Sequence, residues 1–408
     1  MKFGLASKLR KAFAPGAFRT KVLPYLAYYS GLGVAFAGLF RRLPLKRDKI
    51  VFNNFRGFGF GDHQKYIVLE LLRRGVAADI VWLAEDVEKV RREVPEGVRV
   101  VPYSSVAALR ELSTARLWCV NQSMNHFIFR GLRKRRGQIY LQTYHGSLGI
   151  KRIGGDRAGN GEVRLWEGPL RRDAAMIDYL VANAVWEAEA VYRTRFYGCG
   201  EIKLFGHPRN DVFFRNGDRE REKVRRTFGL TDAERLAFYA PTHRSDHSPS
   251  TYLHDAEGLR SAFERRFGGR WRVMVRLHPN MRPYFHEAAM PGAVDATDYP
   301  DMQELLIAAD ALISDFSSCM FDFMLTRRPV FVFAAARENY ERIQGFYYPL
   351  SETPFPIAED EAELRNNIAA FDDAAYRAKV EAFLAEKGCV EDGRATGRVC
   401  DLIEEALG

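Results

Sequence analysis

The sequence has few cysteines, and its first 49 residues have almost no acidic side chains. The five cysteines stand far apart and form no CxxC pair, so we expect neither a disulfide framework nor a zinc site, and a reducing cytoplasm as the compartment. Residues 1–20 contain no apolar core followed by a small-residue cleavage site, which argues against a cleaved signal peptide. A D-x-D motif is also absent, so we predict no metal ligands, and a requirement for Mg²⁺ as cofactor stays open.

The chain is basic. Its 408 residues hold 61 Lys and Arg against 52 Asp and Glu, a formal net charge of +9. The length suggests two domains, and the charge favours anionic partners such as phosphates, nucleotides, nucleic acid or an acidic membrane surface. The excess is concentrated at the start, because residues 1–49 carry eleven basic side chains and a single acidic residue, Asp48.

An uncharged segment, Val22–Phe40, has close to the ~20 residues that a helix needs to span a bilayer. Its proline, glycines and tyrosines, with basic residues on both sides, favour a segment that lies in the membrane interface. A true span and a buried core helix are the alternatives. The basic cluster at 130–137 is usually a solvated surface, but beside such an anchor it is interpreted as a lipid-headgroup patch. We therefore expect a peripheral or monotopic protein on the cytoplasmic face of the cell membrane.

From Lys49 onward, short apolar runs alternate with helical stretches, which predicts parallel sheets covered by helices. The expected strands are 50–55, 80–84, 98–103, 117–121, 139–143, 180–182 and 202–205, and then 236–240, 271–277, 311–314 and 329–333. The expected helices include 63–74, 184–196 and 317–325. We predict an α/β protein with two Rossmann-like, doubly wound domains facing a cleft. Its parts are a membrane-associating segment at 1–48, a first domain at 49–213 and a second at 214–408.

Three glycines, Gly57, Gly59 and Gly61, follow the first predicted strand. The G-x-G-x-G pattern is not the full dinucleotide fingerprint, and no acidic ribose ligand is evident at the next strand end. A tight turn is therefore favoured over a cofactor site.

Polar side chains follow the strands of the second series. Thr242 and Arg244 end one strand, and Arg276 and His278 end the next. Because ligands of open α/β sheets bind beyond the carboxyl ends of the strands, these groups are predicted to point toward a ligand. A lone strand-end histidine is usually structural, so His278 alone is weak support.

Residues 313–323, "ISDFSSCMFDF", place Asp315, Ser317 and Ser318 where a strand passes into a helix. Free backbone N–H groups and two hydroxyls at such a helix start favour a bound phosphate, although a serine N-cap without a ligand is common. In "GHPRNDVFF" (206–214), Arg209 could clamp a phosphate and Asp211 could orient it, with Asn210 between them. The alternative is a charged interdomain loop with an internal Arg–Asp pair.

Six motifs stand in the order seen in the CDP-glycerol glycerophosphotransferase family, and the chain resembles that family from about residue 50 to 385. They are "QTYHGSLGIKRIG", "GHPRNDVFF", "YAPTHR", "VRLHPN", "ISDFSSCMFDFMLTRRPVFVFA" and "ENYERIQGFYYPLSETPFPIA". The resemblance implies a GT-B fold, with the acceptor on the first domain and the CDP-alcohol on the second. It implies transfer of glycerol phosphate from CDP-glycerol, or of a related polyol phosphate, to a prenyl-phosphate-linked or glycan acceptor during teichoic-acid-like or capsule polymer synthesis.

By the same resemblance, His145 matches the base proposed for the family, and Arg244, His278, Ser317 and Ser318 match positions near the donor phosphates. His145 and His278 are the predicted catalytic residues, and an imidazole with a pKa of ~6.5 suits a base that takes the acceptor hydroxyl's proton as CMP leaves. Many members have Thr-Pro-Leu after the His-Gly pair, whereas Ser147 and Leu148 follow here, which puts the acceptor in doubt more than the chemistry.

Two other functions remain open from the sequence. Similar strand-end phosphate contacts would serve a GT-B glycosyltransferase or an epimerase that uses a nucleotide sugar. The basic composition would also fit a non-enzymatic protein that binds nucleic acid or membranes. Nucleic acid is not predicted as a partner, because the basic clusters lack interleaved aromatics and a recognised binding module.

Overall fold

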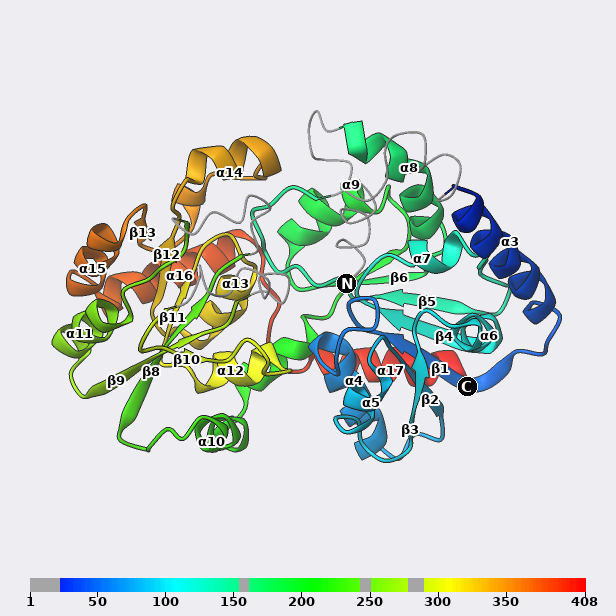
Figure 1. Cartoon of the computed structure of the whole chain (residues 1–408), viewed down its shortest axis with the longest axis horizontal. Coiled ribbons are helices and arrows are strands. Elements are labelled where there is room, and N and C mark those ends of the chain that lie inside the picture. Colours follow the sequence, from blue (N-terminus) through cyan, green and yellow to red (C-terminus); the bar gives the residue numbers. More distant parts are fainter. Residues whose placement is uncertain (1–22, 154–160, 243–250, 278–289) are drawn as a thin grey trace.

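The computed structural model describes residues 23–153, 161–242, 251–277 and 290–408, which form two α/β domains side by side (Figure 1). Each domain has one sheet, and every paired strand in both sheets is parallel. The prediction of two α/β domains with parallel sheets is therefore confirmed. Residues 1–22 of the predicted membrane segment lie outside the described residues.

The first sheet has the strand order β3-β2-β1-β4-β5-β6-β7. Its strands are β1 (Lys46–Asn53), β2 (Asp79–Ala84), β3 (Val98–Pro102), β4 (Ala115–Val120), β5 (Ile139–Gln142), β6 (Tyr179–Ala182) and β7 (Glu201–Leu204). After β3 the chain crosses back over the sheet, so β1 and β4 lie side by side. Parallel strands that are covered on both faces have continuous apolar sequences. Phe52 and Trp82 illustrate this, since both are fully buried and stack at 6.2 Å.

The helical segments of the first half connect these strands. They are α3 (Leu23–Phe40), α4 (Asp62–Arg73), α5 (Val87–Arg91), α6 (Val106–Thr114), α7 (Asn125–Ile128), α8 (Gly161–Ala174), a π-helical segment (Glu187–Tyr192), α9 (Arg193–Arg195) and a 3₁₀ segment (Pro208–Phe214). The helix expected at 184–196 is thus partly π-helical. Ser105 begins α6 by accepting the N–H of Ala108 at 3.0 Å, a typical N-cap.

The second sheet has the order β10-β9-β8-β11-β12-β13. Its strands are β8 (Glu234–Ala240), β9 (Arg270–Val275), β10 (Val294–Asp295), β11 (Ala311–Ser314), β12 (Val330–Phe333) and β13 (Ile357–Ala358). Its helical segments are α10 (Asp218–Thr227), α11 (Ala256–Phe267), α12 (Met302–Ala308), α13 (Cys319–Phe323), α14 (Arg337–Gln344), α15 (Glu361–Ala369) and α16 (Asp373–Glu386), with 3₁₀ turns at Met324–Thr326 and Leu350–Glu352. The helix expected over 317–325 is therefore only five residues long before it tightens into a 3₁₀ turn.

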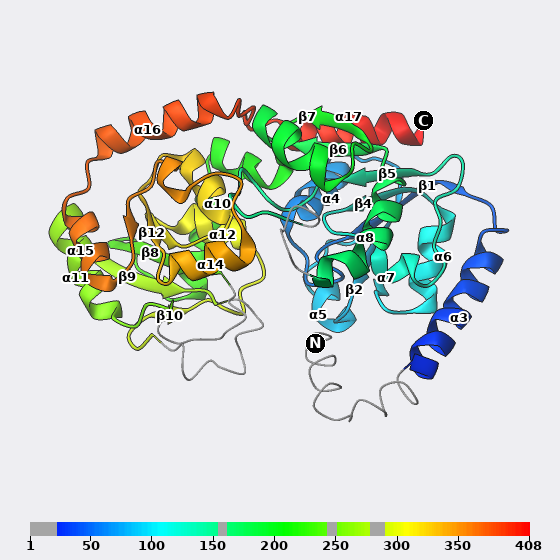
Figure 2. The ribbon, with the colours of Figure 1, turned by 90° about the horizontal axis from the view of Figure 1, so that it is seen from above.

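The last helix, α17 (Ala395–Leu407), returns to the first domain (Figure 2). Its buried residues Val399, Cys400 and Ile403 pack in the same apolar cluster as Ile50 and Leu71. The sequence had placed this helix with the second domain, residues 214–408. Its apolar face packs on the first sheet instead, so the chain returns to the first domain after α16.

Helix α3 lies against the outside of the first domain (Figures 1 and 2). Gly33 and Ala37 form its contact face, because a Cβ on Gly33 would lie 2.8 Å from Arg130 Cβ and Ala37 is buried. No helix among the described residues combines the length and apolar character needed to cross a membrane. The predicted headgroup patch at 130–137 is partly structural, since Arg130 is buried and Lys134 pairs with Asp178 at 2.6 Å.

Candidate active site

The segments that follow the two sheets' strands meet at the domain interface. A Cβ on Gly149, after β5, would lie 3.6 Å from Cβ of Ser318, after β11. Lys151 forms an antiparallel bridge with Phe346 of the second domain. We call the region where these loops meet the interdomain site, and most of the described residues that were predicted from the sequence lie in it or border it.

His145 follows β5, and its ring is held in one orientation. Its Nδ1 atom lies 2.8 Å from the backbone oxygen of Asn121, which follows β4. Because a carbonyl oxygen can only accept, Nδ1 carries the hydrogen, and Nε2 of the neutral ring is left as the proton acceptor. Phe55 packs edge-on to the ring at 5.2 Å. The ring is thus fixed in the tautomer that a general base needs.

Asn121 is itself held on several sides. Its Nδ2 donates to Asn54 Oδ1 at 2.8 Å and to Asp62 Oδ2 at 2.9 Å, and its Oδ1 accepts the N–H of Phe55 at 2.9 Å. These bonds fix the carbonyl that orients His145, as outer-shell partners orient a functional imidazole elsewhere. Asn121 and Asp62 were not predicted as site residues, because neither belongs to a motif with His145.

Burial lowers the pKa of His145 to about 4. The hydrogen bond to Asn121 and the charge of Asp62 oppose this shift, whereas Arg209 and Lys151 add to it. The imidazole is therefore neutral at physiological pH. A bound anion would raise this pKa, because negative charge nearby stabilises the imidazolium.

Arg209 joins the two domains through carboxylates. Its guanidinium donates to Asp62 at 2.9 Å, to Asp322 of α13 at 2.9–3.0 Å, and to the backbone oxygen of His145 at 2.9 Å. The side chain is buried, and although burial lowers its pKa, Asp322 and Asp62 raise that pKa above the ordinary value. The structure thus places Arg209 behind the loop of His145, and the predicted phosphate clamp stays a prediction.

The next two residues also make contacts within the protein. Asn210 Nδ2 donates to Asp322 Oδ1 at 3.0 Å and to Glu391 Oε1 at 2.8 Å. Asp211 accepts the N–H groups of Ala395 and Thr396 at 3.0 and 2.7 Å, so it caps the start of α17. Both residues therefore tie the domain crossover together in this structure, and their predicted substrate contacts remain untested.

The second domain brings different groups to the site. The N–H of Thr242 donates to Asp315 Oδ1 at 2.9 Å, which joins the ends of β8 and β11. Within the described part of the chain, the buried Thr242 hydroxyl has no hydrogen-bond partner. A buried hydroxyl without a partner is costly, so it is a candidate contact for a ligand.

Arg276 follows β9. Among the residues that the structure describes, its guanidinium donates to Met302 Sδ at 3.1 Å. Burial lowers the pKa of Arg276, and Asp301 opposes that shift. Asp301 is already paired with Lys65 at 2.5 Å. Arg276 therefore places a positive charge at the strand ends. No carboxylate of the described residues is bonded to its guanidinium.

Ser317 and Ser318 precede α13. Ser317 Oγ accepts the N–H of Cys319 at 3.5 Å, and Ser318 is the N-cap residue without a side-chain cap bond. Arg244 and His278 lie outside the described residues, so their predicted roles remain predictions. The described residues contain no cluster of three His, Cys, Asp or Glu that could hold a metal ion.

The fold and these side chains define a two-domain α/β protein with a held imidazole on one side of the domain interface and cationic and hydroxyl groups on the other. The family model described as CDP-glycerol:poly(glycerophosphate) glycerophosphotransferase matches residues 35–405. The chain belongs to this family. The resemblance drawn from the six motifs and the predicted enzyme class are thereby confirmed at the level of the family.

Curated relatives make teichoic acids. The chain is 28% identical over 377 residues to the teichoic acid poly(glycerol phosphate) polymerase of Staphylococcus epidermidis, a match that covers 89% of this chain and 51% of that protein. It is 26% identical over 382 residues to the teichoic acid glycerol-phosphate transferase of Staphylococcus aureus, covering 90% of this chain and 95% of that one. The chain thus spans about half the length of the first relative and nearly all of the second.

A solved structure of the wall teichoic acid polymerase TagF has a TM-score of 0.78 and 26% identity, covering 97% of this chain and 98% of that one. A TagF variant soaked with CDPG has a TM-score of 0.77 at 25% identity, with the same coverage. A UDP-N-acetylglucosamine 2-epimerase from Listeria monocytogenes has a TM-score of 0.51 at 13% identity over 88% of this chain and 96% of that one, and shows a shared fold alone.

Proposed function

We propose that this protein transfers glycerol phosphate, or a related polyol phosphate, from a CDP-alcohol to a hydroxyl of a lipid-linked or glycan acceptor. CMP leaves, and the product extends or primes a teichoic-acid-like or capsule polymer. The observation that carries the proposal is the orientation of His145, whose Nδ1 is bonded to Asn121 and whose Nε2 is left to accept a proton.

In this reaction, the hydroxyl oxygen of the acceptor attacks the β-phosphorus of the CDP-alcohol. His145 Nε2 takes the proton of that hydroxyl. The bond from that phosphorus to the oxygen of CMP breaks, and CMP carries the negative charge away. Positioning and charge stabilisation dominate such transfers, so cations are expected around the two phosphates. Among the residues that the structure describes, Arg276 and Thr242 are suited to contact these phosphates. The further proposed contacts are Arg244, His278, Ser317 and Ser318.

The direct test is product analysis. The purified protein is incubated with CDP-glycerol, CDP-ribitol or a UDP-sugar and a synthetic lipid-linked acceptor, and products are identified by mass spectrometry. We expect CMP release and an acceptor heavier by one or more polyol phosphates. Transfer of a sugar from the UDP-sugar, with no reaction of either CDP-alcohol, would support a glycosyltransferase and contradict the proposal.

We also propose that α3 contacts the membrane surface that carries the acceptor. Leu32, Phe36 and Leu39 lie on one face of the helix and are 43%, 37% and 52% exposed. No side chain from Leu23 to Phe40 is charged, and Arg41 and Arg42 follow directly. An apolar face beside basic residues is typical of a helix that lies in a bilayer interface.

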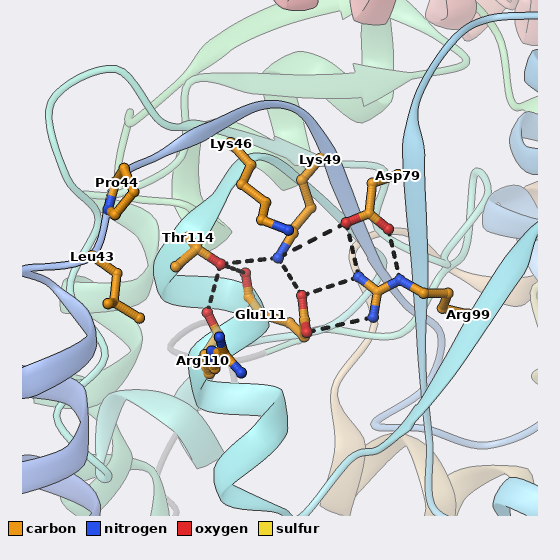
Figure 3. Close-up of a pocket in the computed structure, with 9 residues that line it drawn as sticks. All are labelled: Leu43, Pro44, Lys46, Lys49, Asp79, Arg99, Arg110, Glu111 and Thr114. Atoms are coloured by element: carbon orange, nitrogen blue, oxygen red, sulfur yellow. Dashed lines mark hydrogen bonds and ion pairs between the residues drawn. The ribbon is translucent and has the colours of Figure 1, made fainter.

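A basic cavity of about 280 Å³ lies just beyond α3 (Figure 3). In it, Lys49 and Arg99 pair with Asp79 and Glu111. Lys46 and Arg110 line the same cavity and have no ion pair in the described portion of the chain, which leaves an excess of positive charge suited to phosphate headgroups.

The membrane proposal is tested with vesicles. Leu39→Ser should weaken binding to anionic vesicles by about tenfold. This corresponds to part of the free energy gained when a leucine side chain is removed from water. Leu69→Ser is the control, since Leu69 is similarly exposed on α4. Equal effects of the two substitutions would exclude α3 as the contact.

A further inference from the structure

Residues 148–152, which follow the loop of His145, cross from the first domain into the second. We call them the crossover segment. The N–H of Tyr347 donates to the oxygen of Ile150 at 2.7 Å, and the N–H of Arg152 donates to the oxygen of Gly345 at 2.9 Å. The Tyr348 hydroxyl donates to the oxygen of Leu148. A short antiparallel pairing therefore fastens the loop of His145 to the second domain.

The crossover segment packs into the second domain. Leu148 and Ile150 are fully buried, and both belong to the apolar core of the second domain. Gly149 lies beside Ser318, because a Cβ placed on Gly149 would be 3.6 Å from Ser318 Cβ. Lys151 is two residues further along the segment, where its backbone forms the bridge with Phe346 of the second domain.

The charges that act on Lys151 connect it with the segment after β11. Burial lowers the pKa of Lys151, and the charge of Asp315 opposes that shift. Lys151 in turn lowers the pKa of His145. Its ammonium group therefore lies within electrostatic reach of both the predicted base and the segment that carries Ser317.

Lys151 lacks a direct partner within the described ranges. No hydrogen bond or ion pair of its side chain occurs there, and the nearby Asp315 carboxylate already accepts the N–H groups of Thr242 and Phe316 at 2.9 and 2.6 Å. A partly buried ammonium ion without a bonded anion is unfavourable, and a bound phosphate would reverse that cost.

We propose that Lys151 binds the diphosphate of the CDP-alcohol, on the side that faces His145. This rests on the proposed function. The ammonium group then stabilises negative charge on the β-phosphate, where the acceptor oxygen attacks, and the crossover segment holds it in place relative to the second domain. Lys151 would thus link the base on one domain with the donor on the other.

Binding of CDP and CMP separates this role from a structural one. CDP keeps both phosphates and CMP has one, so wild-type protein should bind CDP more tightly and gain more thermal stability from it. In Lys151→Gln this advantage of CDP over CMP should shrink by about tenfold or more, as expected for a lost charge-assisted phosphate contact. Lys151→Arg should keep most of it, and Lys89→Gln, an exposed lysine on α5, should match wild type.

The free protein supplies the second readout. Lys151→Gln should be at least as heat-stable as wild type without ligand, because the substitution removes an unpaired ammonium ion. With CDP-glycerol, its kcat/KM should fall by about 10²–10³-fold, comparable to the loss of one oxyanion donor.

An unchanged preference for CDP in Lys151→Gln would overturn the inference, and so would a loss of stability with equal losses for CDP and CMP. The binding experiment does not require turnover. Wild-type protein that binds CDP through Lys151 but transfers no polyol phosphate would contradict the proposed function and leave the phosphate contact established.

Discussion

The two sides of the interdomain site differ in how their polar groups are satisfied. On the first domain, His145, Asn121 and Asp62 bond to one another and to Arg209. On the second domain, Thr242 Oγ1 has no hydrogen-bond partner in the described chain, and Arg276 contacts a methionine sulfur. The residues around the imidazole are therefore held in place without a ligand, whereas the Thr242 hydroxyl and the Arg276 guanidinium would gain partners from a bound phosphate. This difference is what a preformed base and a charged, exchangeable donor require.

The largest expected effect is on turnover at the first side. His145→Gln should lower kcat by about 10²–10⁴-fold, the usual contribution of a positioned base, with the affinity for CDP-glycerol nearly unchanged. Glutamine keeps hydrogen-bonding capacity but cannot take the proton. His254→Gln, at an exposed histidine of the second domain, is the control. Near wild-type turnover in His145→Gln would make His145 a structural residue, and the base would be sought at His278 or Asp211.

The second effect is on stability. Arg209→Met leaves Asp62 and Asp322 buried without their shared partner, which should lower the free energy of unfolding by about 3–5 kcal/mol in denaturant titrations. Arg193→Met breaks an exposed pair with Glu189 and should cost at most ~1 kcal/mol. If Arg209→Met is as stable as that control and instead loses affinity for CDP, then Arg209 is the phosphate clamp that the sequence suggested.

The third effect is on donor affinity at the second side. Arg276→Gln should weaken CDP binding by about 1.5–3 kcal/mol, measured by calorimetry, because it removes a charged phosphate contact. Arg272→Gln is the control, since Arg272 lies within β9 and its guanidinium pairs with Glu234 at 3.5 Å. Equal affinities in the two variants would remove Arg276 from the donor site.

The smallest effect contrasts two threonines. Thr242→Val removes a hydroxyl without a described partner, so the free protein should keep its stability while CDP affinity falls by about 0.5–1.5 kcal/mol. Thr143→Val removes a hydroxyl that accepts from Gln64 at 2.9 Å, so it should cost stability and leave CDP affinity unchanged. The reverse pattern would contradict the division between the two sides.

The sequence was sufficient for the two parallel-sheet domains, because buried parallel strands read as apolar runs between helical stretches. It placed His145 correctly after β5, but the atoms that orient the ring, on Asn121 and Asp62, come from distant positions that only folding brings together. Arg209 shows the same limit. Its carboxylate partners, one from each domain, come from positions that the sequence does not connect with it. Helix α17 was misplaced because chain order does not reveal which sheet covers an apolar face.

The central claim, that His145 is a base fixed before the donor binds, is tested most directly by NMR of ¹⁵N-histidine-labelled protein. The His145 signals are assigned by their loss in His145→Gln. We predict that at neutral pH Nδ1 is protonated and Nε2 is not, that the ring titrates with a pKa of about 4 in the free protein, and that CDP raises this pKa. Protonation at Nε2, or a pKa at the ordinary histidine value that CDP does not change, would contradict the account.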